Sequence, residues 1–276
     1  MKSVFPVIWK SLLVGLTYTM TLMIGGLLVK LVGLSLPEAK NTPVTLIWTF
    51  AGGMIAGLFL GPIASSIPLS RLRHVLVWSS AILFNLVSVA IEGYFFAPDL
   101  IGDSLTGLIL QQIAAALMTG WVITMLFAPK EIVAAVPRSS HSPFSWSWRF
   151  VLSALSYVVF YFIFGAINFA FVTRPYYQTH TGGLTVPPLW AVLIAEPIRG
   201  VLIVMSALPF LLALRAGKRR LVLLTGLILF SIGGLVPLTM QASTLPFFLL
   251  AASAVEILFQ NFSTGAVAAL LLGRST

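Results

Sequence analysis

The residues best suited to chemistry lie close together at Glu196, Pro197, Arg199 and Gly200, inside an apolar run over 186–214. A run of that length can cross a bilayer, because a hydrocarbon core of about 30 Å needs roughly 20 apolar residues of helix. The three-residue spacing of Glu196 and Arg199 puts both on one helix face, where each neutralises the other. Pro197 is expected to bend the helix, and Gly200 to admit a second backbone or a ligand. The cluster indicates either a ligand site or a structural ion pair.

Glu256 is another ionisable group expected at membrane depth, and Gln260 and Asn261 follow it one turn later. Because no cation lies near it in the sequence, Glu256 must be protonated, meet Arg199 across helices or hold a bound cation. A guanidinium offers five donors, enough for two carboxylates. We therefore expect Glu196, Arg199 and Glu256 to converge on one cavity, with Arg199 at its centre.

The composition defines the class of protein. Of the 276 residues, 59% are hydrophobic and 8% are charged, whereas a soluble domain carries about 25% charged residues. The mean hydropathy is +1.04. These values predict an all-α integral membrane protein. The net charge of +9 resides mainly in short loops, so it is a topology signal and no nucleic-acid partner is expected. The absence of cysteine excludes disulfides, thiolate metal sites and thiol catalysis.

Apolar runs predict eight transmembrane helices, over 11–35, 46–69, 75–97, 105–128, 148–172, 186–214, 221–241 and 245–272. The two halves of the chain match in order: Trp9 with Trp148, Lys10 with Arg149, Tyr18 with Tyr157, Gly26 with Gly165, Gln111 with Glu256, and Thr119-Gly120 with Thr264-Gly265. We expect two four-helix repeats, residues 1–130 and 146–276, joined by a cytoplasmic linker at 131–145. An even number of spans gives both repeats the same orientation, related by an axis along the membrane normal.

Lysine and arginine gather on one side of this predicted topology. That side carries Lys2, Lys10, Arg71, Arg73, Lys130, Arg138, Arg149, Arg215, Lys218, Arg219, Arg220 and Arg274, and the loops of the other side carry only Lys40 and Arg174. By the positive-inside rule, both termini are cytoplasmic. We expect a multi-pass protein of the cell membrane.

The polar residues within the predicted spans favour the outer leaflet half. They include Lys30, Glu92, Gln111, Gln112 and Asn168, whereas only Asn85 falls near mid-depth. A one-sided distribution favours a water-accessible cavity that opens outward. Glu92 and Lys30 lie near span ends, where long side chains reach the interface on their own. The histidines His74, His141 and His180 are expected in loops, too far apart to bind one metal ion.

These patterns predict a membrane protein that transports or binds a small polar, ionic or amphiphilic ligand. The predicted ligand site comprises Glu196, Arg199, Glu256, Gln260, Asn261, Gln111 and Gln112. Two alternatives stay open: a non-catalytic subunit of a larger membrane complex, and an intramembrane enzyme acting on lipid with Glu256 as acid or base. No catalytic residue, metal ligand or cofactor is assigned. Membrane lipids are expected partners, and partner subunits or a homo-oligomer remain open.

Overall fold

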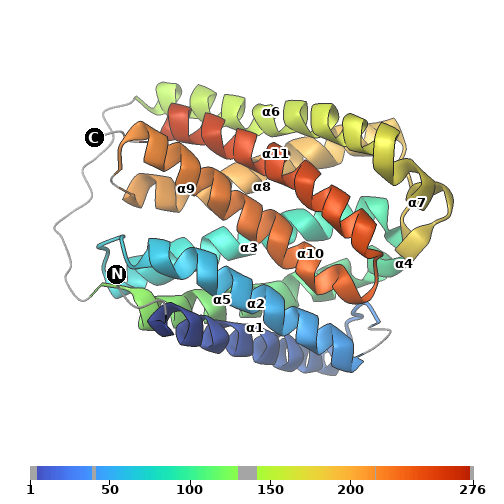
Figure 1. Ribbon diagram of the computed structural model, residues 1–276, viewed down its shortest axis with the longest axis horizontal. Helices are drawn as coiled ribbons and strands as arrows, with labels where there is room; N and C mark the ends of the chain where they lie inside the picture. Colours follow the sequence, from blue (N-terminus) through green and yellow to red (C-terminus); the bar gives the residue numbers. More distant parts are fainter. Residues whose placement is uncertain (1–4, 39–41, 130–141, 215, 274–276) are drawn as a thin grey trace.

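The computed structural model describes residues 5–38, 42–129, 142–214 and 216–273, and the elements in these ranges are helices. They form a bundle of long, roughly aligned helices (Figure 1). Within the described residues, eight helices are long and apolar enough to cross a membrane, and each coincides with one predicted span. The chain therefore has the architecture of a multi-pass α-helical membrane protein.

The first four membrane helices come from the part of the chain before residue 128. They are α1 (Phe5–Leu31), α2 (Thr42–Ala64), α3 (Arg71–Phe96) and α5 (Leu105–Phe127), with α4 (Pro98–Ile101) and the 3₁₀ turn η1 (Gly102–Ser104) between the last two. The predicted spans are correct to within a few residues, except that α1 begins six residues earlier than expected.

The last four membrane helices lie after residue 142, and two of them contain a π-helical turn. They are α6 (Pro143–Asn168), continued by η2 (Phe169–Thr173) and α7 (Arg174–Gln178); α8 (Leu189–Ala213); α9 (Lys218–Phe230), continued by η4 (Ser231–Leu235), α10 (Val236–Met240) and η5 (Gln241–Ser243); and α11 (Phe247–Leu272). A further 3₁₀ turn, η3 (Thr181–Gly183), precedes α8. Helices α4 and α7 lie at the same end of the bundle (Figure 1), which we call the α7 end.

The helices pack in a defined order. Helix α1 contacts α2 and α5, and α3 contacts α5; helix α6 contacts α8 and α11, and α9 contacts α11. The two groups of helices meet mainly where α3 packs against α8 and where α10 packs against α2. The α3–α8 contact is the one that positions the charged site.

Glycines allow these helices to approach closely. A β-carbon at Gly53 would lie 2.9 Å from the Gly15 α-carbon and 2.8 Å from the Tyr18 β-carbon, so α2 rests directly on the backbone of α1. At Gly200 of α8, a β-carbon would overlap the backbone carbonyl oxygen of Ala154 in α6. Small residues at helix contacts are typical of membrane bundles. The expectation that Gly200 admits a second backbone is confirmed.

Large apolar side chains cover the outside of the bundle as well as its centre. Trp78, Phe210 and Leu229 are fully buried, whereas Phe171 and Phe247 are each 83% exposed. Many leucines of α1 and α6 are also exposed. Exposed apolar surface on this scale is unsuited to water and is the surface that lipid tails cover.

His74 corrects one expectation, because it lies in the first turn of α3 and is fully buried instead of in a loop. Its Nε2 lies 3.0 Å from the Ala64 carbonyl oxygen and its Nδ1 3.1 Å from the indole nitrogen of Trp78. Since the carbonyl can only accept and the indole can only donate, the ring carries its proton on Nε2. His74 therefore ties α3 to the end of α2. His141 lies outside the described residues, and His180 lies in the loop before η3 as expected.

Candidate functional site

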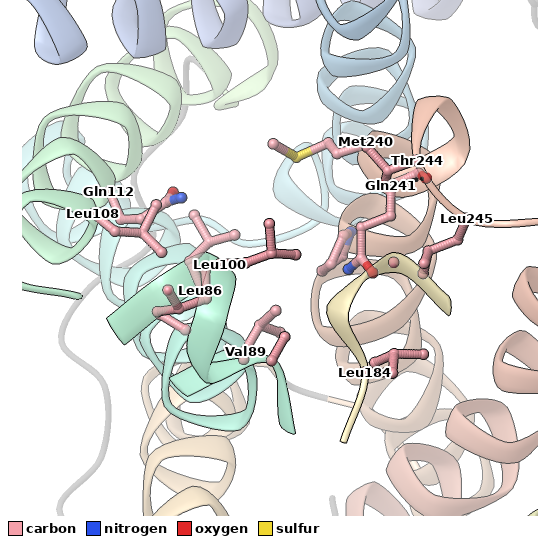
Figure 2. A pocket seen from close by; sticks show the side chains of 16 residues that line it. Leu86, Val89, Leu100, Leu108, Gln112, Leu184, Met240, Gln241, Thr244 and Leu245 are labelled. Atoms are coloured by element: carbon pink, nitrogen blue, oxygen red, sulfur yellow. Dashed lines mark hydrogen bonds between the residues drawn. The ribbon is translucent and has the colours of Figure 1, made fainter. Parts of the chain in front are cut away.

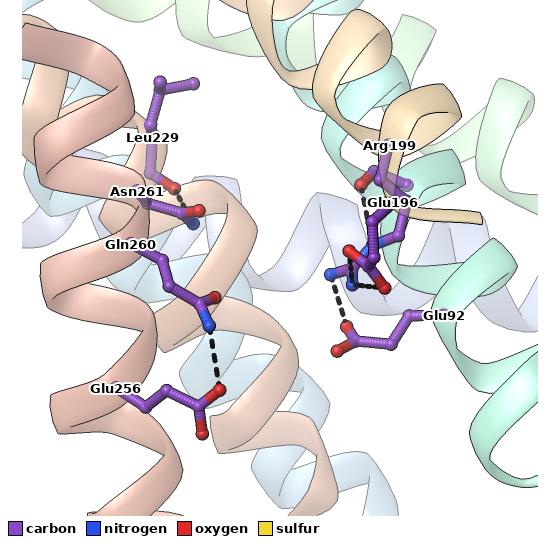
Figure 3. A network of polar contacts seen from close by, with 8 residues as sticks. Glu92, Glu196, Arg199, Leu229, Glu256, Gln260 and Asn261 are labelled. Atoms are coloured by element: carbon purple, nitrogen blue, oxygen red, sulfur yellow. Dashed lines mark hydrogen bonds and ion pairs between the residues drawn. The ribbon is translucent and has the colours of Figure 1, made fainter. Parts of the chain in front are cut away.

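Arg199 is the centre of a buried polar network (Figure 3). Its Nη1 donates to both carboxylate oxygens of Glu196, at 2.9 and 2.8 Å, which confirms the pair expected from the three-residue spacing. Its Nη2 lies 2.6 Å from an oxygen of Glu92, and its Nε donates to the Ser88 hydroxyl at 3.4 Å. All three guanidinium nitrogens are thus engaged, and Arg199 is 5% exposed.

Helix α8 supplies the buried half of this network. Glu196 is completely buried, and the Tyr157 side chain of α6 lies near its carboxylate. The Arg199 guanidinium carbon lies 5.4 Å from the centre of the Tyr157 ring, in a cation–π contact. Helix α8 continues through Pro197 to Ala213. At about 1.5 Å per residue, Arg199 lies about 15 Å along α8 from Leu189.

Glu92 corrects the expectation that its side chain extends independently to the interface. It comes from the last two turns of α3 and forms an ion pair with Arg199 across the α3–α8 contact. The Glu92 side chain is 34% exposed, in contrast to that of Glu196. One guanidinium therefore joins two carboxylates, one enclosed and one open. When both acids are ionised, the group of three carries one surplus negative charge.

Glu256 corrects the expected partner of Arg199. Its carboxylate accepts hydrogen bonds from the side-chain amides of Asn168 and Gln260, the latter at 2.8 Å. Among the described residues, the ion pairs are those of Arg199 with Glu92 and Glu196, and neither includes Glu256. Figure 3 shows Glu256 on a different helix from the Arg199 network. Arg199 thus contacts two carboxylates, but the second one is Glu92 and not the expected Glu256.

The other predicted site residues divide between several places. Gln260 bonds Glu256, whereas Asn261 donates to the Leu229 carbonyl at 3.1 Å and joins α11 to α9. Gln111 donates to the Leu22 carbonyl at 2.7 Å and joins α5 to α1. Gln112 is buried with its carbonyl oxygen unpartnered among the described residues, and it faces a cavity. The structure therefore does not bring all seven residues to one point.

Three cavities lie side by side toward the α7 end, and neighbouring cavities have wall residues in common. The first, of about 240 Å³, lies between α3 and α5 on one side and α10 and η5 on the other, with Gln112 and Gln241 on its walls (Figure 2). The second, of about 160 Å³, shares Gly93 and Gln241 with the first and includes Glu92. The third, of about 360 Å³, includes Glu256 and shares Phe96 and Tyr177 with the second.

Asn85 strengthens the α3–α8 contact about two turns before Glu92 on α3. Its side-chain nitrogen donates to the Ser206 hydroxyl of α8 at 2.7 Å and to the Ala81 carbonyl at 3.0 Å. Together with Ser88 and Glu92, it forms a polar face along α3 that meets α8. The sequence shows these three polar residues at spacings of three and four, and this helical period was the signal that could have pointed to Glu92.

Comparison with known proteins supplies no relative for this chain: no family model matches it, and no curated protein or solved structure is significantly similar.

Proposed function

We propose that this protein binds and transports a small polar, ionic or amphiphilic ligand across the cell membrane, using the cavities that Glu92 and Glu256 line. One observation carries the proposal: a buried guanidinium holds one enclosed carboxylate and a second carboxylate that lies on a cavity wall. Intramembrane charges are costly and are usually retained for a task. An open carboxylate that borders a cavity offers a ligand a group to bind.

The position of the Glu92 cavity supports transport over simple binding. Its walls come from α3 in the first half of the chain and from η4, α10 and α11 in the second half. In many transporters the binding site lies between two repeats, and movement of one repeat against the other opens the site to alternate sides. This part of the argument is an analogy at the level of architecture.

We also propose that residues 1–130 and 146–276 are two repeats of the same orientation, and several matched contacts support this. The Lys10 ammonium donates to the Leu126 carbonyl at the end of α5, and the Arg149 guanidinium donates to the Leu271 carbonyl at the end of α11. In α5, Gly120 packs on Ser79 of α3; in α11, Gly265 packs on Gly226 of α9. Lys10 and Arg149, and likewise Gly120 and Gly265, were matched in the sequence, and their contacts lie on corresponding helices of the two halves.

The proposed orientation places both termini in the cytoplasm, and it can be tested cleanly because the sequence has no cysteine. Single cysteines would be introduced at Ser3, at Thr276 and at the exposed Thr179 of the loop after α7. A membrane-impermeant maleimide should label only the Thr179 site in intact cells. Labelling of the Ser3 or Thr276 site from outside would refute the orientation.

Ligand binding is tested by thermal stability of the purified protein against a panel of small cations, anions and zwitterions. The proposal expects at least one class to raise the melting temperature, because a ligand that binds only the folded state stabilises it. Glu92→Gln should abolish or strongly reduce that shift. Asp103→Asn, which removes an exposed carboxylate at the same end of the bundle, is the matched control. No stabilisation by any member of the panel would argue against a ligand site.

Transport itself needs a second measurement. Protein in sealed vesicles should move the stabilising ligand down its concentration gradient faster than vesicles that contain the Glu92→Gln variant. Binding without movement would leave a receptor or a subunit of a complex as the better description.

A further inference from the structure

The Glu256 carboxylate has polar partners but no counter-charge among the described residues. Its hydrogen bonds come from the neutral amides of Asn168 and Gln260. The charge of Arg199 acts on it, but that guanidinium is already engaged by Glu92 and Glu196. An ionised carboxylate at membrane depth needs a positive partner, and a carboxyl without one keeps its proton.

The cavity that Glu256 borders is rich in aromatic rings. Its volume is about 360 Å³, and its walls carry Phe96 of α3, Tyr161, Phe162 and Phe169 of α6 and η2, Tyr177 of α7, and apolar residues at the start of α8. Among the described residues, those that line it include no lysine, arginine or histidine. The face of an aromatic ring attracts cations, and several rings around one carboxylate form a recognition site for organic ammonium groups. An anion would find no positive group on these walls.

Gly165 brings the carboxylate to the cavity. A β-carbon at Gly165 would lie 3.2 Å from Glu256 Oε1, so the missing side chain leaves room for the acid beside the α6 backbone. Gly165 is itself a wall residue of the same cavity. The acid of α11 can therefore act on a ligand that lies between α6 and α8.

Glu256 also borders an apolar hollow on the other side of α6. This hollow, of about 500 Å³, is lined by α6, η2 and α11, including Phe164, Phe171 and Phe248. Phe171 is 83% and Phe248 64% exposed on the surface that we assign to lipid. A ligand with an apolar body can dissolve in the bilayer and approach Glu256 from there, whereas a small inorganic ion cannot.

We propose that the Glu256 cavity binds a lipophilic organic ammonium ion in exchange for a proton. The protonated carboxyl releases its proton to water as the cation enters, so the bound state is a carboxylate with one cation and the free state a neutral acid. One charge enters and one leaves, and no covalent bond other than O–H changes. The inference rests on the proposed function and specifies its ligand class.

Other ionisable groups face Glu256 and belong in any account of the pH dependence. They are Glu92 of α3, Arg199 of α8 with its partner Glu196, and the hydroxyls of Tyr161 on α6 and Tyr177 on α7. The remainder of α11 carries no other Asp, Glu, Lys, Arg or His. Glu92, Glu196 and Arg199 are engaged in ion pairs, and Tyr161 and Tyr177 are phenols. Glu256 is the remaining carboxyl group of this set, so it is the one we expect to exchange its proton.

The test compares two ligands of nearly identical shape on the wild-type protein. Benzyltrimethylammonium and neopentylbenzene differ in whether a charged nitrogen or a neutral carbon lies at the branch point. Calorimetric titration in an uncharged detergent should show binding of the cation, at least about tenfold tighter than the neutral analogue. Its affinity should rise with pH, by up to about tenfold per pH unit while the free site is protonated, and titrations in two buffers should show release of up to about one proton.

Two variants test whether the cation preference and the proton release depend on Glu256. Glu256→Gln keeps the shape and should lose both the cation preference and the proton release. Asp99→Asn removes an exposed carboxylate at the same end of the bundle and should retain both. Equal binding of cation and neutral analogue, or cation binding without proton release, would overturn the inference even if Glu256→Gln cannot be purified.

The outcomes also separate this inference from the proposed function. Stabilisation by benzenesulfonate or a zwitterion, without any response to benzyltrimethylammonium, would refute the cation site and leave the proposed function standing. Absence of any response across the whole panel would count against both.

Discussion

Gln111 and Glu256 occupy comparable places in the two halves of the molecule, yet they differ in charge. A β-carbon at Gly26 of α1 would lie 3.1 Å from the Gln111 amide nitrogen, and one at Gly165 of α6 would lie 3.2 Å from a Glu256 oxygen. In each half, a glycine of the first helix makes room for a polar side chain of the last. The two places have nearly the same shape.

The chemistry at the two places is different. Gln111 donates to the Leu22 carbonyl and closes the contact between α5 and α1. Glu256 accepts from Asn168 and Gln260 and borders two cavities. Gln111 shows that the packing at this position needs a side chain of this size. Glu256 has the same size and is, in addition, ionisable. At this matched position, the ionisable group lies in the second half.

The largest expected effect comes from removing the charge of Arg199 on α8. Arg199→Leu leaves Glu196 buried without a counter-charge, which should cost about 3–5 kcal/mol of stability. The triple variant Arg199→Leu, Glu196→Leu, Glu92→Gln should recover most of that loss, since apolar replacement of a whole buried network is often neutral. Denaturant titration in detergent measures both, with the exposed Arg174→Leu as control. Unchanged stability of Arg199→Leu would show that the network is not a structural necessity.

Placing an acid at Gln111 tests whether the matched position in the first half tolerates a charge. Gln111→Glu places an acid against the Leu22 carbonyl, where an ionised carboxylate cannot donate, and should cost about 2–3 kcal/mol near neutral pH. The loss should shrink as the pH falls, because a protonated carboxyl can donate to that carbonyl. Melting temperatures at several pH values measure this. A variant as stable as wild type at every pH would mean that the Gln111 site tolerates charge, and that it does not differ from the Glu256 site in this respect.

Filling a close helix contact with a methyl group should destabilise the protein to a similar extent in the two halves. Gly53→Ala and Gly200→Ala each force a β-carbon onto the backbone of the neighbouring helix, and each should cost about 1–3 kcal/mol. Gly217→Ala is the matched control, because nothing lies within 4 Å of the added atom. If only one of the first two variants is destabilised, the close approach matters in one half alone.

The smallest effect is expected at the ends of α5 and α11. Lys10→Met and Arg149→Met each remove a donor from a carbonyl at the last turn of a helix, and each should cost about 1 kcal/mol. Similar losses in the two variants would sharpen the comparison between the halves. A clear difference between them would weaken the proposal of a repeat.

The sequence was sufficient for the helices and for the local ion pair. Each of the eight membrane helices is a long apolar run with few charges, so length and composition alone locate it. Glu196 and Arg199 pair because they share one helix, and helical periodicity depends on no other part of the fold. Both features arise within one segment of chain.

The contacts between helices were predicted less well. Similar depth was taken to indicate proximity for Glu256 and Arg199, but α11 packs on α6 and α9 more than on α8, so the Asn168 amide reaches Glu256 instead. Glu92 was missed because the sequence does not show that α3 packs against α8. His74 was placed in a loop because hydropathy does not register the polar first turn of α3, whose burial depends on α2 and α5.

The two carboxylates on Arg199 differ in what they hold together. The Glu196 contact stays within α8, whereas the Glu92 contact crosses from α3 to α8, between the halves of the chain. If one half rotates against the other, the first contact moves as a rigid unit and the second must lengthen. Arg199 would then still be neutralised by Glu196, while Glu92 would be released on the cavity wall as a free charge. In such a rotation, the contact with Glu196 would be kept and the contact with Glu92 would be broken.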